Sequence, residues 1–195
     1  MITTNNRRRR LESGLQITEA LTELGIVHSE VWQNLTLSNL VRSIGSEKVV
    51  LEQDGNSLNI TTEAAVVFVR FRLRNLILEV FEVFQFFKNT GRFFRKPRFD
   101  GLGETLKAGE TPRNGARRLL IEELGFDKNT EEYPLTESGI QTLGPMESEK
   151  YPGLRATFIR YRFTYLPGWR LFKPIYIENR PNRLILYSLK PRWLK

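Results

Sequence analysis

The sequence predicts an α+β fold with a helical extension at its N-terminus. Three observations lead to this class. Two segments with helical spacing of apolar residues precede residue 49, most later segments are β-prone, and one capped amphipathic helix interrupts them at residues 112–124. An apolar fraction of 40% in 195 residues, with thirteen phenylalanines, supports a folded protein with a sizeable core.

The N-terminal part is predicted to be a basic arm followed by two helices. Residues 1–10, MITTNNRRRR, contain no acid and predict a flexible arm. Apolar spacing predicts one helix from Leu11 to Leu24, ended by Gly25, and a second from Ser29 to Ile44. Two short helices need tertiary packing, so we expect them to cap the nearest sheet; a dimerisation element is the alternative.

Strands are predicted on both sides of the central helix. Asp54-Gly55 predicts a tight turn inside a hairpin from Val49 to Ile60. Leu76 to Phe87 is ambiguous because its polar residues recur every three, but its Val and Phe content favours a strand. The other predicted strands are Ala64–Leu73, Arg92–Phe94, Ile140–Met146, Ala156–Tyr165 and Arg183–Leu189, with a polar loop at Asp127–Ser138. The expected organisation is an arm at 1–10, a helical and hairpin extension at 11–60, and a main domain at 61–195.

The central helix has clear signals at both ends. Thr111 suits the N-cap, Pro112 the first helical position, and Gly125 the position just past the end. Inside the helix, an apolar stripe for packing repeats every four residues: Ala116, Leu120 and Leu124. Arg118 and Glu122 are four apart and are expected to pair. The adjacent carboxylates of Glu122 and Glu123 suit a hard divalent cation, although an ordinary acidic helix end would look the same.

The loop and this helix together, GLGETLKAGETPRNGARRLLIEELGF from Gly101 to Phe126, resemble the Nudix box. That pattern is G, five residues, E, seven residues, then R-E-U-x-E-E-x-G-U, where U is bulky and apolar. The matching positions are Glu110, Arg118, Leu120, Glu122, Glu123, Gly125 and Phe126. The resemblance implies a Nudix-like α/β/α sandwich with a mixed sheet. It covers about residues 64–166 as a fold and is specific across 101–126.

Two positions depart from the family pattern. Glu104 stands at the box glycine, directly after Gly103, and Leu119 stands where a metal-binding glutamate is expected. On a helical wheel Leu119 falls towards Glu122 and Glu123, away from the centre of the apolar stripe. A leucine cannot bind magnesium, so Glu104 or a glutamate of a later loop would have to supply the missing carboxylate.

The resemblance implies Mg²⁺-dependent (or Mn²⁺-dependent) cleavage of a pyrophosphate bond in a nucleoside diphosphate linked to another moiety. The residues it implies for catalysis are Glu122, Glu123 and Glu104. Those it implies for the metal are Gly103, through its carbonyl, Glu122 and Glu123. Glu110, Arg118 and Gly125 would support the loop and helix.

Candidate substrate-binding residues lie outside the box. Arg95, Lys96 and Arg98 alternate with aromatic residues just before the loop, where they would neutralise phosphates. Tyr151, in a later loop, is a candidate for stacking on a base. A basic edge strand explains the first group equally well, and a surface tyrosine before proline is common.

Composition narrows the partners and the chemistry. Thirty Lys and Arg against twenty-two Asp and Glu give a net charge of +8, which favours a nucleotide, another phosphorylated small molecule or RNA. The chain has no cysteine and a single histidine, His28, so thiol chemistry and a histidine-based triad are not expected. No uncharged apolar run of about eighteen residues occurs, and residues 1–10 lack the apolar core of a secretory signal. We therefore expect no membrane span, and the cytoplasm as the compartment.

Two further functions remain open at this point. Leu119, Glu104 and the basic balance also fit a non-catalytic Nudix-like module that binds nucleotide or RNA. A scaffold whose terminal segments bind a protein partner is the third possibility. The substrate and the oligomeric state have no signature in the sequence.

Overall fold

The computed structural model describes residues 8–26, 34–94, 100–127 and 134–193. The chain divides into two compact units. Unit 1 comprises Met1–Ala64, Thr105–Glu110 and Gln141–Arg160, and unit 2 comprises Ala65–Glu104, Thr111–Ile140 and Tyr161–Lys195. The predicted boundary after residue 60 stays a prediction.

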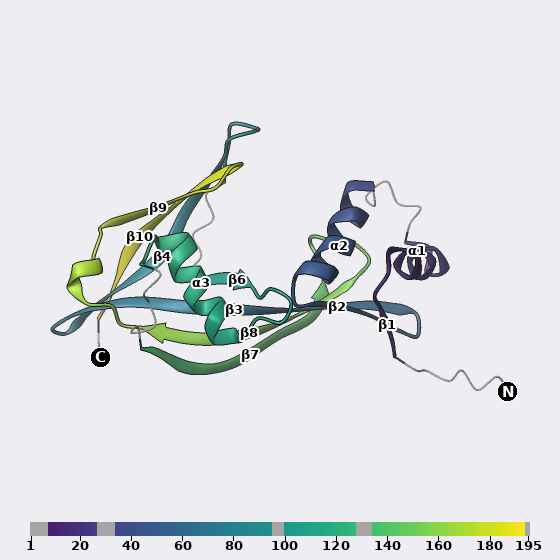
Figure 1. The fold of residues 1–195 in the computed structure, drawn as a ribbon, viewed down its shortest axis with the longest axis horizontal. Helices are drawn as coiled ribbons and strands as arrows, with labels where there is room; N and C mark the ends of the chain where they lie inside the picture. The colour runs from purple at the N-terminus through teal and green to yellow at the C-terminus, as the bar shows by residue number, and fades with distance from the viewer. Residues whose placement is uncertain (1–7, 27–33, 95–99, 128–133, 194–195) are drawn as a thin grey trace. The chain divides into compact units, whose positions relative to one another are not determined.

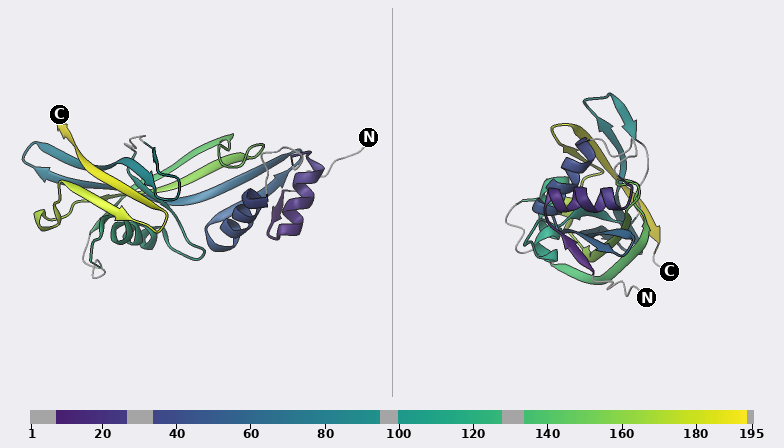
Figure 2. Two further views of the ribbon diagram at one scale, coloured as in Figure 1. Left: turned by 90° about the horizontal axis from the view of Figure 1, so that it is seen from above. Right: turned by 90° about the vertical axis from the view of Figure 1, so that its right-hand side faces the viewer.

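Unit 1 is a small antiparallel sheet with two helices. Strand β1 (Arg9–Leu11) pairs with β2 (Val49–Asp54), which pairs with the first part of β3 (Ser57–Leu73) through the predicted turn. Helices α1 (Gly14–Glu23) and α2 (Asn34–Ser46) lie next to each other (Figure 2). They bury their apolar sides in one core with the sheet, as expected from the apolar spacing.

The ends of the unit 1 helices follow local signals. Ser13 caps α1 and forms a capping box with Gln16, and Gly25 adopts a positive φ of 69° just past its end. The second helix begins at Asn34 in the described chain, and its predicted start at 29–33 lies outside the described residues. Arg9 and Arg10, which the sequence assigns to a flexible arm, are instead in β1, because they extend the pairing edge of β2.

Unit 2 contains the central helix and most of the long strands (Figure 1). Its elements are the rest of β3, β4 (Leu76–Phe87), β5 (Arg92–Phe94), β6 (Leu102–Thr105), α3 (Pro112–Leu124), the 3-10 turn η2 (Trp169–Leu171), β9 (Ile175–Asn179) and β10 (Arg183–Trp193). The strand order is β3-β4-β10-β9, with antiparallel ladders along it, and β6 pairs with β3. Helix α3 packs against β9.

Two more strands, β7 (Leu135–Glu147) and β8 (Arg155–Tyr165), pair with each other, and β8 also pairs with β3. Strand β7 starts inside the predicted polar loop at 127–138, so that loop is shorter than expected. The polar residues that suggested a loop lie on exposed positions of β7. The ambiguous segment Leu76–Phe87 is a strand, as predicted, because its Val and Phe side chains pair across β10 and β5.

The α+β class with an N-terminal helical extension is confirmed. No helix in the described ranges is long and apolar enough to cross a membrane.

Candidate active site

The strand before the loop places the first box residues. Gly101 has a φ of 88°, and a Cβ there would lie 2.7 Å from a side-chain carbon of Val66, so both the backbone angle and the space require glycine. Gly103 and Glu104 follow in β6, and Gly103 lies against the backbone of Ala65 on β3. The close packing of β6 on β3 fixes where the Glu104 side chain starts.

Helix α3 begins and ends where the sequence predicts. The Thr111 side chain accepts a hydrogen bond from the Asn114 backbone N–H at 3.3 Å, and Pro112 occupies the first turn. Gly125 ends the helix in the left-handed conformation, with φ 66° and ψ 32°. Phe126 is then buried, and its ring contacts those of Tyr165 and Tyr176, which ties the end of α3 to β8 and β9.

Glu110, in unit 1, closes the turn before the helix. Its carboxylate accepts a hydrogen bond from the Lys107 backbone N–H at 2.9 Å, and its own N–H donates to the Lys107 carbonyl at 3.0 Å. These two hydrogen bonds are the kind that a residue supporting the loop would form.

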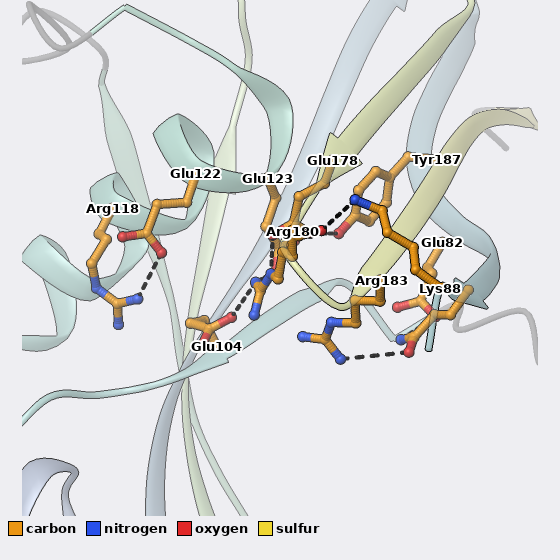
Figure 3. Close-up of polar contacts among 11 residues, drawn as sticks. Glu82, Lys88, Glu104, Arg118, Glu122, Glu123, Glu178, Arg180, Arg183 and Tyr187 are labelled. Atoms are coloured by element: carbon orange, nitrogen blue, oxygen red, sulfur yellow. Dashed lines mark hydrogen bonds and ion pairs between the residues drawn. The ribbon is translucent and has the colours of Figure 1, made fainter. Parts of the chain in front are cut away.

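Leu119 lies on the side of Glu123, as the helical wheel predicts, but this side of α3 is buried rather than exposed. Leu119 is fully buried, together with the predicted stripe, so it packs in the apolar core. It lies one turn before Glu123 on the buried face, because residues four apart share a side of a helix. Glu122 is turned away: its side chain is 45% exposed and pairs with Arg118 at 3.2 Å (Figure 3). The adjacent carboxylates therefore do not converge.

Glu123 instead faces a cluster of charged residues that meet at Arg180. The Arg180 Nη2 atom lies 3.1 Å from the Glu104 Oε2 and 3.7 Å from the Glu123 Oε1. Its Nε donates to Glu178 at the end of β9. Glu178 also accepts a hydrogen bond from the hydroxyl of Tyr187 on β10 at 3.0 Å (Figure 3). Glu123, Glu178 and Tyr187 are buried, whereas Arg180 and Glu104 keep about a quarter of their side chains exposed.

Sequence reasoning identified Glu104 and Glu123 but missed Glu178, Arg180 and Tyr187. Strands β9 and β10 form a hairpin that brings these three residues to α3, about sixty residues earlier in the chain. The one local signal is the two-residue spacing of Glu178, near the end of β9, and Arg180, just after the strand.

The cluster changes the acid–base behaviour of its members. Burial, followed by the nearby negative charges of Glu178 and Glu104, raises the pKa of Glu123 from 4.5 to about 8. Burial alone would lower the pKa of Arg180, but its hydrogen bonds to Glu178 and Glu104 outweigh burial and raise it. Burial and the charges of Glu123 and Glu178 raise the pKa of Tyr187, so this phenol stays protonated and acts as a donor.

The predicted metal ligands do not fit a magnesium ion as they are arranged. Magnesium needs several oxygen ligands around one point. Glu122 pairs with Arg118, while Glu104 and Glu123 share the Arg180 guanidinium. Across residues 8–26, 34–94, 100–127 and 134–193, no group of three or more Asp, Glu or His side chains is close enough to hold a metal together.

The predicted substrate-binding residues divide into two sets. Arg95, Lys96 and Arg98 lie outside the described residues. Tyr151 belongs to unit 1, where it is only 4% exposed and packs in the core beside a cavity of about 180 Å³. Its ring contacts the Lys150 ammonium, with 5.1 Å between the nitrogen and the ring centroid. Stacking on a base would require this ring to leave the core.

Comparisons with known proteins give similarity in structure alone. No protein-family model matches the chain, and no curated protein matches its sequence. An Ap4A hydrolase from C. elegans is 16% identical, with a TM-score of 0.36 over 55% of this chain and 70% of that one. The dihydroneopterin triphosphate pyrophosphohydrolase of E. coli is 16% identical, with a TM-score of 0.38 over 68% and 79%. A mutT/nudix family protein from Listeria innocua is 14% identical, with a TM-score of 0.37 over 56% and 67%. All three TM-scores are below 0.5, so the functional assignment rests on the residues of this chain.

Proposed function

We propose that the chain is a Nudix-type pyrophosphohydrolase that cleaves a nucleoside diphosphate linked to another moiety. The observation that carries this proposal is the position of Glu123. It occupies the last glutamate position of the box, on the buried face of a helix capped as the box requires, and it faces Glu104 across a single cation. A carboxylate buried beside two others is unusual for an ordinary helix end.

Glu123 is the strongest candidate for the proton-transfer role. A pKa of about 8 allows its carboxyl group to exchange a proton at neutral pH, as a general base acting on water must. Glu104 also contacts Arg180, and it would supply the second carboxylate of the site, from β6. Glu122, being half exposed, would act from the outer edge of α3 only after leaving Arg118.

The supporting residues of the box have separate proposed roles. Glu110 holds the turn before α3 through its bond to the Lys107 N–H, and Gly125 ends the helix. Arg118 holds Glu122. Arg95, Lys96 and Arg98 remain proposed phosphate contacts.

The test is a hydrolysis assay with a panel of nucleoside diphosphate derivatives: nucleotide sugars, dinucleoside polyphosphates and dinucleotide cofactors. Release of a phosphate monoester is followed with and without millimolar magnesium. The proposal expects at least one derivative to be cleaved, and expects Glu123→Gln to lose most of that activity. The matched control is Glu137→Gln, because Glu137 is an exposed glutamate of unit 2 that pairs with Arg113. Hydrolysis unchanged in the double variant Glu122→Gln/Glu123→Gln would refute the assignment.

A second candidate is a non-catalytic module that binds nucleotide. It is argued from the burial of Leu119 and the Arg180 ion pairs, because both replace features that a metal-dependent site needs. It predicts nucleotide binding that is indifferent to magnesium and that weakens with salt, since the attraction is electrostatic. Binding without turnover of any derivative would favour this module over the hydrolase.

A further inference from the structure

Arg180 occupies the point where three carboxylates converge. Its guanidinium contacts Glu104 from β6, Glu123 from α3 and Glu178 from its own hairpin. These carboxylates come from three separate elements, and among the residues drawn in Figure 3 Arg180 is the cation that each of them contacts. A guanidinium stays charged at every accessible pH and offers several N–H donors in a planar fork, so it can bridge carboxylates from different directions.

The register of β9 turns a glutamate inward, towards this polar cluster, and isoleucines outward. Along the strand Ile175 and Ile177 are exposed, at 50% and 59%, while Tyr176 and Glu178 are buried. A shift by one residue would bury the isoleucines and expose the glutamate. The observed register is the opposite, which requires that the buried Glu178 be satisfied, and Arg180 and Tyr187 satisfy it.

The backbone holds Arg180 at this point. Its N–H donates to the Arg183 carbonyl at 2.9 Å and closes the β9–β10 turn. The Lys88 ammonium, from the end of β4, donates to the Arg180 carbonyl at 2.7 Å. The side chain is 26% exposed, so the guanidinium lies at the solvent edge of the cluster.

We propose that Arg180 is the built-in cation of this site: its guanidinium bridges Glu104, Glu123 and Glu178 in place of a divalent metal, and a metal ion gains access to these carboxylates only when the guanidinium is removed. The site is thereby kept closed to metal in the described conformation. The inference takes one point from the proposed function, namely that the metal would be a hard divalent cation. Binding and stability are what test it, so it can fail or succeed independently of hydrolysis.

The experiment compares wild type with Arg180→Gln. Each protein is titrated with Mn²⁺ by calorimetry, and its thermal unfolding is followed with and without the metal. Wild type should bind Mn²⁺ only weakly, at the upper end of a millimolar titration. Arg180→Gln should bind at one site on the order of tenfold to hundredfold more tightly, because the charge-assisted hydrogen bonds that the metal must otherwise displace are gone. Its unfolding midpoint should rise with Mn²⁺, whereas that of wild type should not.

Arg183→Gln is the matched control, since Arg183 lies in the same turn and its guanidinium donates a hydrogen bond to the Gln85 side chain, at 3.5 Å. It should behave as wild type does. Arg180→Lys keeps the charge but not the fork, and should show intermediate affinity; this variant decides the matter if Arg180→Gln does not fold. Equal Mn²⁺ affinity in wild type and the Arg180 variants, or no binding in any of them, would overturn the proposal.

Discussion

Glu123 should make the stability of this protein fall as the pH rises from mildly acidic to mildly basic. Burial among other carboxylates raises its pKa in the folded state to about 8, against 4.5 in the unfolded chain. Below pH 4.5 the group is protonated in both states, and its contribution is fully present. Between 4.5 and 8 the unfolded chain releases the proton first, so stability is lost progressively until the folded pKa is passed. At about 1.4 kcal/mol per pKa unit, the full loss is roughly 5 kcal/mol.

The assay is urea denaturation of wild type and Glu123→Gln at a series of pH values from 4 to about 9. Glutamine is neutral at every pH and can still form hydrogen bonds, so the difference between the two free energies of unfolding isolates the proton of Glu123. From the lowest to the highest pH, we expect the free energy of unfolding of Glu123→Gln to rise by several kcal/mol relative to that of wild type. The free energy of unfolding of Glu137→Gln should follow that of wild type. A pH-independent difference would refute the claim that Glu123 is buried in a negative environment.

Three further changes test the local structure, each by urea denaturation. Leu119→Ala should destabilise the protein by about 2–5 kcal/mol, because Leu119 is fully buried. The control Leu15→Ala, at a position 70% exposed, should change stability by less than about 0.5 kcal/mol, and equal effects of the two changes would contradict the core position of Leu119. Thr111→Ala should cost about 1 kcal/mol by removing the α3 N-cap, and Thr111→Ser should restore most of it; a neutral alanine would mean that the cap is dispensable. Gly101→Ala should lower the free energy of unfolding more than Gly109→Ala does. Both glycines have a positive φ, but only at Gly101 would a Cβ lie against a neighbouring side chain, at 2.7 Å. The reverse order would contradict the packing of β6.

Features that depend on neighbouring residues could be predicted from the sequence. The ends of α3 are encoded by Thr111, Pro112 and Gly125, whose effects act within one turn of the helix. The hairpin at Asp54-Gly55 is equally local, and both are found where the residues indicate. The pairing of Arg118 with Glu122 follows from helical spacing alone.

Features that depend on strand pairing could not be predicted in this way. Glu178 follows the exposed Ile177 on the chain, and the isoleucines at 175 and 177 would by themselves favour the opposite register, with a solvent-facing glutamate. Only the pairing of β9 with β10 turns Glu178 inward. Arg180 joins Glu123 because β9 packs against α3, a contact with no local signal. The helical wheel correctly places Leu119 on the side of Glu123, but it does not show that this side of α3 is buried as well as the apolar stripe.

The most direct test of the account is the hydrolysis of nucleoside diphosphate derivatives by Arg180→Gln, measured beside wild type with and without magnesium. If the carboxylates around Glu123 form a pyrophosphohydrolase site closed by Arg180, the variant should cleave a derivative faster than wild type, and only with magnesium. Equal rates in the two proteins, or no cleavage by either although nucleotide binds, would contradict it.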